Sequence, residues 1–285
     1  MPITPSLWQR FCGVWMGALV AEALLEQCSR SAACRYQPLS PGFWSVHQDA
    51  AVTIAKSLLQ ASTPPESRRS ASLIHPTTLV PFILLYGDNP LALTAAIQHW
   101  SDSHDRPLAD QVIMLHSVGL ILHNSSPIHR ILSADVAYPW PDYDHPALRQ
   151  TLRTVAALYQ NGASLTAAQQ ALAYLPLVYR AYGLALFCFV TTPQDCRLTL
   201  QRAIGCTDQP LTTIGAGLLV GAYNGELGLP IEWRAAQLGA YDERVRPVVT
   251  QLFARWCGVY DGRSLPAMDY DAIAVSVPGA IRSQR

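Results

Sequence analysis

The chain contains few charged residues: Asp, Glu, Lys and Arg make up 14% of its 285 residues, while half of the residues are hydrophobic. Lysine is almost missing, since Lys56 is the only one among 20 basic residues, and 20 acidic residues bring the formal net charge to zero. Such an apolar composition excludes an intrinsically disordered chain. Without excess positive charge, we expect no binding to nucleic acid or to an anionic membrane surface. A weakly charged surface instead favours a protein partner or a homo-oligomer.

Several common catalytic and nucleotide-binding motifs are also missing. The sequence contains no GxSxG nucleophile motif, no P-loop, no GxGxxG fingerprint, no HExxH and no CxxC pair. Each of these patterns places particular groups for one kind of chemistry. Motif spacing alone therefore assigns no reaction to this chain.

The seven cysteines form an odd number, and most lie in apolar stretches. This pattern is typical of reduced core cysteines, so we expect a cytoplasmic protein without a disulfide framework. The apolar run from Phe11 to Ala21 mimics a short signal peptide, but Glu22 and Glu26 continue its helical pattern, which favours a core helix. Other charge-free stretches are shorter than the ~20 apolar residues of a membrane span or contain proline and histidine, so no span is expected.

Apolar residues recur at helical spacing along nearly the whole chain, and no segment shows the sustained alternation of a strand. The polar segments 62–70 and 134–146 do not separate regions of different composition. We therefore predict one all-α domain over residues 1–262 and a loose tail over residues 263–285. The expected helices cover residues 6–28, 46–61, 74–86, 90–103, 108–123, 127–133, 146–160, 164–174, 176–190, 193–204, 211–224 and 241–258.

Glycines at a spacing of four mark two of these helices, at Gly13 and Gly17 and at Gly217, Gly221 and Gly225. Each glycine costs about 1 kcal/mol of helix propensity, but the missing side chain lets two helix backbones approach closely. A phosphate-binding role is less compatible, because the amides within a helix are already hydrogen-bonded. The glycines therefore predict close helix–helix packing.

The segment from Thr212 to Trp233, TTIGAGLLVGAYNGELGLPIEW, resembles the C-terminal signature of the ADP-ribosylglycohydrolase family, of the dinitrogenase-reductase-activating glycohydrolase type. The segment from Arg10 to Leu24 is similar to the first helix of that family, and residues 186–205 resemble the helix that leads into the signature. The similarity is closest to divergent forms from cyanobacterial genomes. The resemblance implies an all-α, single-domain orthogonal helical bundle.

The same resemblance implies a reaction. Members of this family cleave the N- or O-glycosidic bond to ADP-ribose and use two divalent ions, usually Mg²⁺. Carboxylates and threonine hydroxyls hold the ions, which bind the ribose hydroxyls and activate water against an oxocarbenium-like centre. Two motifs supply these ligands: a Thr-Asp-Asp-Thr at the start of an early helix, and an Asp-x-Asp-Thr before the glycine-rich helix.

Most of the corresponding positions are substituted in this chain. The Asp-x-Asp-Thr motif corresponds to residues 208–211, where only Asp208 is kept. The Thr-Asp-Asp-Thr motif corresponds to residues 45–48, which read Ser-Val-His-Gln, with Asp49 one step further on. The Gly-Asp of the first helix is replaced by Ala-Glu, ending in Glu22. Hard cations with few anionic oxygen ligands bind weakly, so we expect no cofactor, or Mg²⁺ only where the family site is partly kept.

The residues at or near these positions form the candidate site. We assign catalytic roles to Asp208, Asp49 and Glu22, ligand-binding roles to His47, Thr212, Thr213 and Asn224, and no metal ligand. One hypothesis is a non-catalytic family member, whose degenerate site serves binding of an ADP-ribose-like ligand, regulation or assembly. The alternative is an active hydrolase of ADP-ribosylated protein or a related conjugate, with Asp208 and either Asp49 or His47 as general acid and base.

Each candidate also has a purely structural interpretation. Asp208 suits the N-cap of the helix that follows, and the two threonines suit hydrogen bonds to the backbone of its first turn. Asn224 and Gly225 suit a left-handed helix end. Glu22 could lie at the rim of a pocket or pair with an arginine. These alternatives stay open at the level of the sequence.

Overall fold

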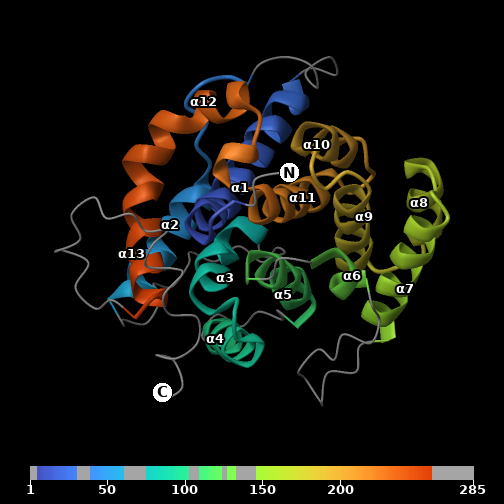
Figure 1. Ribbon diagram of the computed structural model, residues 1–285, viewed down its shortest axis with the longest axis horizontal. Helices are drawn as coiled ribbons and strands as arrows, with labels where there is room; N and C mark the ends of the chain where they lie inside the picture. The colour runs from blue at the N-terminus through green and yellow to red at the C-terminus, as the bar shows by residue number, and fades with distance from the viewer. Residues whose placement is uncertain are drawn as a thin grey trace.

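The computed structural model describes residues 5–30, 39–60, 75–102, 109–123, 127–132 and 146–258. Within these ranges every regular element is helical, so the all-α prediction is confirmed (Figure 1). The elements are α1 (Leu7–Arg30), α2 (Val46–Leu59), the 3-10 helix η2 (Pro76–Leu79), α3 (Val80–Tyr86), α4 (Pro90–Asp102), α5 (Ala109–His123), α6 (Pro127–Leu132), α7 (Pro146–Gln160), α8 (Leu165–Leu172), α9 (Leu177–Thr191), α10 (Cys196–Ile204), α11 (Gln209–Asn224), the 3-10 helix η3 (Glu226–Gly228), α12 (Ile231–Ala240), the π-helix η4 (Tyr241–Val245) and α13 (Arg246–Trp256).

Helices α1 and α11 pack against each other at the centre of the molecule, with α12 and α13 to one side and α7 and α8 to the other (Figure 1). The glycines make this contact possible. A Cβ atom on Gly13 would overlap the backbone of Gly221, and one on Gly17 would overlap the backbone of Gly217. Because the pairs run in opposite order, the two helices are antiparallel, and the predicted close packing is confirmed.

Helices α2 and α9 fix which ends of the chain meet. Ser45, before α2, bonds to Glu22, whereas Gln48 bonds to the earlier Trp15, so α2 is antiparallel to α1. Helix α9 runs parallel to α11, since Thr212 lies against Ala181 and the later Tyr223 lies against Phe189. The N-terminal ends of α2, α9 and α11 therefore lie at one end of the core, beside the second half of α1.

The C-terminal part of the fold departs from the expected helices. Residues 231–240 form α12, where no helix was predicted, and the helix expected at 241–258 begins as the π-helix η4. Trp233 anchors this region, because its side chain is buried under the guanidinium of Arg197. The predicted tail, residues 263–285, lies outside the described residues.

Helix α1 is long and apolar enough to cross a membrane, and 78% of its most apolar window is buried inside the fold, as in a core helix. One prediction about the cysteines is wrong: Cys28 is disulfide-bonded. Cys28 lies in the half-buried last turns of α1 rather than in the apolar core. Its sulfur is therefore accessible to another thiol. The five other described cysteines are free.

Candidate functional site

A buried carboxylate lies at the end of the core where α2, α9 and α11 begin. Glu22 is 5% exposed, and Ser45 Oγ donates to its Oε2 at 2.5 Å. Thr77 Oγ1 donates to the other carboxylate oxygen, and His75 Nδ1 lies 3.5 Å from the same atom. We call these residues, together with Gln48, the Glu22 cluster. Glu22 thus neither sits at an exposed rim nor pairs with an arginine, as the sequence left open.

The local sequence explains how the cluster is built. Ser45 is the N-cap of α2, where its hydroxyl accepts the backbone N–H of Gln48 at 3.2 Å and donates to Glu22. The Gln48 side chain is fully buried and accepts the indole N–H of Trp15 at 2.8 Å. This cap residue therefore both starts α2 and donates one of the hydrogen bonds that the buried carboxylate accepts.

The ionisable groups in and beside the cluster have shifted pKa values. Burial raises the pKa of Glu22, although hydrogen bonds from Ser45 and Thr77 act in the opposite direction. The rings of His47 and His75 stack at 3.6 Å between centroids, and burial lowers the pKa of His75 to about 3. Burial lowers the pKa of His47 as well. Both imidazoles are therefore neutral at pH 7, and the structure brings the predicted His47 to Glu22 through His75.

Asp208 has a partner that the sequence did not reveal. It occupies the N-cap position of α11, but its side chain makes no capping hydrogen bond. Instead its carboxylate accepts two hydrogen bonds from the guanidinium of Arg180, on α9, one of them 2.9 Å from Nη2 to Oδ1. Arg180 Nη1 also donates to the carbonyl of Ala173 at 3.1 Å. The predicted capping bond is wrong because a bidentate ion pair takes its place.

The two predicted threonines lie inside the fold at the start of α11. Thr212 Oγ1 donates to the carbonyl of Ala181 at 3.4 Å. Thr213 is fully buried, and its hydroxyl has no hydrogen-bond partner within the described part of the chain. Thr213 precedes Gly217 by one turn, and Ala21 follows Gly17 by one turn, so the antiparallel register places Thr213 at the level of Glu22. The structure thus brings Thr213 and Glu22 to the same end of the core.

Two other predicted residues lie elsewhere. The Asp49 side chain is 67% exposed; it accepts the indole N–H of Trp44 at 2.7 Å and lies 3.9 Å from Arg244 Nη1. Asn224 lies at the far end of α11, where its amide donates to the carbonyl of Pro193 at 2.7 Å. Gly225 ends the helix with a positive φ of 69°, but its ψ of 177° is not that of the predicted left-handed cap. The Glu22 cluster therefore receives neither Asp49 nor Asn224.

These donors do not fit two magnesium ions. Within the described ranges, no group of three or more His, Cys, Asp or Glu side chains could hold a metal ion. Both oxygens of Glu22 accept hydroxyl hydrogen bonds, and both oxygens of Asp208 face the positive charge of Arg180. Mg²⁺ requires oxygen ligands in octahedral geometry and is repelled by a fixed cation. The described donors therefore favour hydrogen bonding over the coordination of two magnesium ions.

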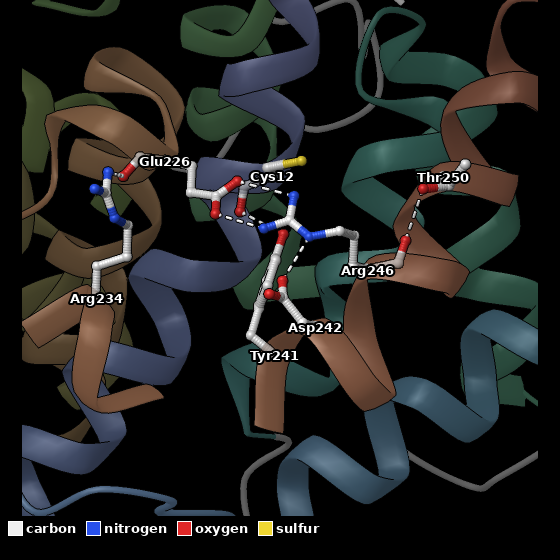
Figure 2. Close-up of polar contacts among 7 residues, drawn as sticks. All are labelled: Cys12, Glu226, Arg234, Tyr241, Asp242, Arg246 and Thr250. Carbon is white, nitrogen blue, oxygen red and sulfur yellow. Dashed lines mark hydrogen bonds and ion pairs between the residues drawn. The ribbon is translucent and has the colours of Figure 1, made fainter. Parts of the chain in front are cut away.

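A second buried polar cluster lies at the opposite end of α1 and α11 (Figure 2). Arg246 donates to both oxygens of Glu226, at 2.7 and 3.3 Å, and to Asp242 at 2.6 Å. Tyr241 donates to the carbonyl of Cys12 at 3.1 Å. Burial raises the pKa of the Tyr241 hydroxyl and of the Cys12 thiol, so both stay protonated. These groups, which we call the Glu226 clamp, join helices rather than offer a nucleophile.

The sequence pointed only weakly to the residues that matter here. Asp242 and Arg246 show the i, i+4 spacing of a helical ion pair, which could have indicated the clamp. Arg180 carries no such signal, because its partner is 28 residues away. Its role follows only from the parallel packing of α9 against α11.

Comparison with known proteins agrees with the resemblance seen in the sequence. Residues 70–262 match the family model described as ADP-ribosylglycohydrolase. No curated protein matches the chain. The matched segment covers more than half of the chain and contains His75, Arg180, Asp208 and the whole of α11, so the chain belongs to the ADP-ribosylglycohydrolase family.

Proposed function

We propose that this chain is a non-hydrolytic member of its family, a divergent form of cyanobacterial type that binds a ligand without magnesium. The observation that carries the proposal is the bidentate pair between Arg180 and Asp208. The one aspartate kept from the Asp-x-Asp-Thr motif already has an internal cation as its counter-ion. If Asp208 turned away from Arg180 to bind a metal, the partly buried guanidinium would lose its partner, which is strongly unfavourable.

The Glu22 cluster supports the same proposal. A carboxylate with a raised pKa and two hydroxyl donors is a poor ligand for a hard cation, because part of its negative charge is already compensated. Neutral imidazoles and hydroxyls instead suit the hydroxyl groups of a sugar. We therefore propose an ADP-ribose-like ligand, bound through neutral hydrogen bonds, with a protein partner or a second copy of the chain as the other candidate.

The competing function is hydrolysis of ADP-ribosylated protein, with Asp208 and either Asp49 or His47 as acid and base. In its favour, His47 is neutral and could accept a proton. Against it, Asp49 faces Trp44 and Arg244, and Asp208 faces Arg180. A hydrolase of this kind requires Asp208 to leave its arginine during turnover.

Calorimetric titration and product release separate the two functions. We expect no heat of binding and no shift of the melting temperature with millimolar Mg²⁺, and a shift with ADP-ribose that EDTA does not abolish. We also expect no ADP-ribose to be released from ADP-ribosyl-arginine. Release by the wild-type chain that is lost in Asp208→Ala would overturn the non-hydrolytic function.

A matched pair of variants tests the role of the internal cation. Arg180→Ala removes the counter-ion of Asp208, whereas Arg30→Ala removes an arginine from the exposed pair with Glu26. We expect only the first to create measurable Mg²⁺ affinity or to lower the melting temperature by several degrees. Equal behaviour of both variants would show that Arg180 is not what keeps metal out.

A further inference from the structure

Arg244 lies beside the Glu22 cluster and is supported by an aromatic ring. Its guanidinium lies over the indole of Trp44, 4.9 Å from the ring centroid. Arg244 belongs to the π-helix η4, a rare kind of element that frequently occurs at functional sites. Trp44 directly precedes Ser45, whose hydroxyl donates to the carboxylate of Glu22. Two consecutive residues of the chain thus connect this arginine with the buried carboxylate.

The guanidinium of Arg244 is held in position without the use of its hydrogen-bond donors. The Trp44 indole N–H donates to Oδ1 of Asp49 at 2.7 Å, and Arg244 Nη1 lies 3.9 Å from the same oxygen. That distance is an electrostatic contact but is too long for a hydrogen bond. Among the residues that the structure describes, Arg244 has no hydrogen-bond acceptor, and its side chain is 48% exposed. Its N–H groups can therefore bind an anion from solvent.

The ligand of the proposed function needs such a cation. ADP-ribose contains a diphosphate, which is negatively charged at neutral pH. The Glu22 cluster offers hydroxyls, a neutral imidazole, an amide and a carboxylate. Arg180 is already occupied, because it donates to Asp208 and to the carbonyl of Ala173. The diphosphate therefore requires a cation that neither the cluster nor Arg180 supplies.

The start of helix α2 makes the surroundings of Arg244 favourable for an anion. This helix has 14 residues and begins at Val46, which is 75% exposed and follows Trp44 and Ser45 in the chain. The N-terminal end of a helix carries a positive partial charge, which adds to the charge of the guanidinium. The two positive groups and the exposed surface together favour the binding of a phosphate there.

We propose that Arg244 binds a phosphate group of the ADP-ribose-like ligand, whose sugar lies against the Glu22 cluster. This role rests on the proposed function and specifies what recognises the anionic part of the ligand. The planar guanidinium donates two parallel hydrogen bonds to phosphate oxygens, while the face of Trp44 holds it in place. Asp49 is a positioning residue that orients Trp44, and its charge opposes that of the phosphate.

Calorimetric titration of the full chain in EDTA tests this role with two probes, ADP-ribose and inorganic pyrophosphate. We expect Arg244→Ala to weaken the binding of both by about tenfold to a hundredfold, because a charge-assisted bidentate contact is lost. Arg244→Lys keeps the charge but not the planar fork, and should recover only part of the affinity. The control Lys56→Ala removes an exposed charge from the same helix, about 15 Å from its first residue, and should bind both probes as the wild type does.

Asp49→Asn should change the affinity in the opposite direction. The amide oxygen of asparagine can still accept the indole N–H of Trp44, whereas the negative charge beside Arg244 is gone. We expect both probes to bind a few times more tightly than to the wild type. Unchanged or weaker binding would contradict the placement of the phosphate beside Asp49.

The outcomes separate the phosphate contact from the proposed function. Equal ADP-ribose affinity in the wild type and in Arg244→Ala would overturn the contact and leave the proposed ligand in place. Binding of pyrophosphate that depends on Arg244, without binding of ADP-ribose, would support the contact and contradict the proposed ligand. If the wild type binds neither probe, both are wrong. Should Arg244→Ala melt well below the wild type, Arg244→Lys decides, because wild-type affinity in that variant would also overturn the bidentate contact.

Discussion

The neutral state of His75 makes the stability of this fold depend on pH. The pKa of His75 is about 3 in the folded protein, against about 6.5 for an unperturbed histidine. As the pH falls below about 6.5, the unfolded chain takes up a proton that the folded protein refuses, so the free energy of unfolding decreases until the pH approaches 3. Between about pH 7 and pH 5 we expect the wild type to lose up to about 2 kcal/mol more than His75→Gln, measured by urea unfolding.

Three other groups in the fold have shifted pKa values, so the comparison between variants is essential. Burial lowers the pKa of His116 to about 4 and lowers the pKa of His47, which stacks on His75, so both add a loss of stability in acid. The raised pKa of Glu22 has the opposite sign, because the folded protein then binds a proton more readily than the unfolded chain. All three groups are present in wild type and in His75→Gln. The exposed His99→Gln serves as a control that should keep the wild-type slope, and equal slopes in all three proteins would contradict the prediction.

Single residues show which features of the site can be predicted from the sequence and which cannot. Helix register brings Glu22 and Thr213, both named from the resemblance to the family, to one level of the core. The partner of Asp208 could not be predicted, since an ion pair between α9 and α11 depends on how two helices pack rather than on spacing within either.

At the scale of elements, the contact between α1 and α11 is the most sensitive point. A Cβ atom on Gly17 would meet the backbone of Gly217, which cannot move without separating the two helices. We therefore expect Gly17→Ala to cost about 3 kcal/mol or more in urea unfolding, despite the better helix propensity of alanine. The measurement compares the midpoint and slope of the transition with those of the wild type.

A glycine in another helix provides the control for this prediction. Gly239, in α12, has no atom within 4 Å of the position that a Cβ would take. Gly239→Ala should stabilise the protein by up to about 1 kcal/mol, because only helix propensity changes. If Gly17→Ala were as well tolerated as Gly239→Ala, the close packing of α1 on α11 would be wrong.

The helices show which sequence patterns predict an element and which elements have no such pattern. Spacing of apolar residues and of glycines predicted nearly all of the described helices and the contact at the centre. Helix α12 was missed because it has little apolar periodicity: its two buried residues are Trp233 and the polar Gln237, while the apolar Ile231 is exposed. The π-helix η4 has no such period either; it is held by tertiary contacts of Tyr241 and Val245 inside the core.

At the scale of the whole molecule, the antiparallel pair of α1 and α11 separates two polar clusters with different tasks. One end holds the Glu22 cluster and Thr213, whose buried hydroxyl has no hydrogen-bond partner among the described residues. At the other end, every main polar group of the Glu226 clamp is hydrogen-bonded, which joins η4 to α1 and α13 to η3 (Figure 2). A fully satisfied network stabilises, whereas a site for a ligand keeps unmet hydrogen-bonding capacity.

This division of tasks predicts that the clamp can be weakened without affecting ligand binding. Glu226→Gln leaves Arg246 with the exposed Asp242 as its remaining anionic partner, and because Arg246 is about one third exposed, we expect a loss of about 2 kcal/mol rather than the larger cost of a fully buried pair. Glu26→Gln breaks the exposed pair with Arg30 and should change stability by less than about 0.5 kcal/mol. Urea unfolding measures both variants, and ADP-ribose titration should give the wild-type affinity for each. A loss of affinity in Glu226→Gln would mean that the two ends of the α1–α11 pair are coupled, and that the clamp belongs to the site.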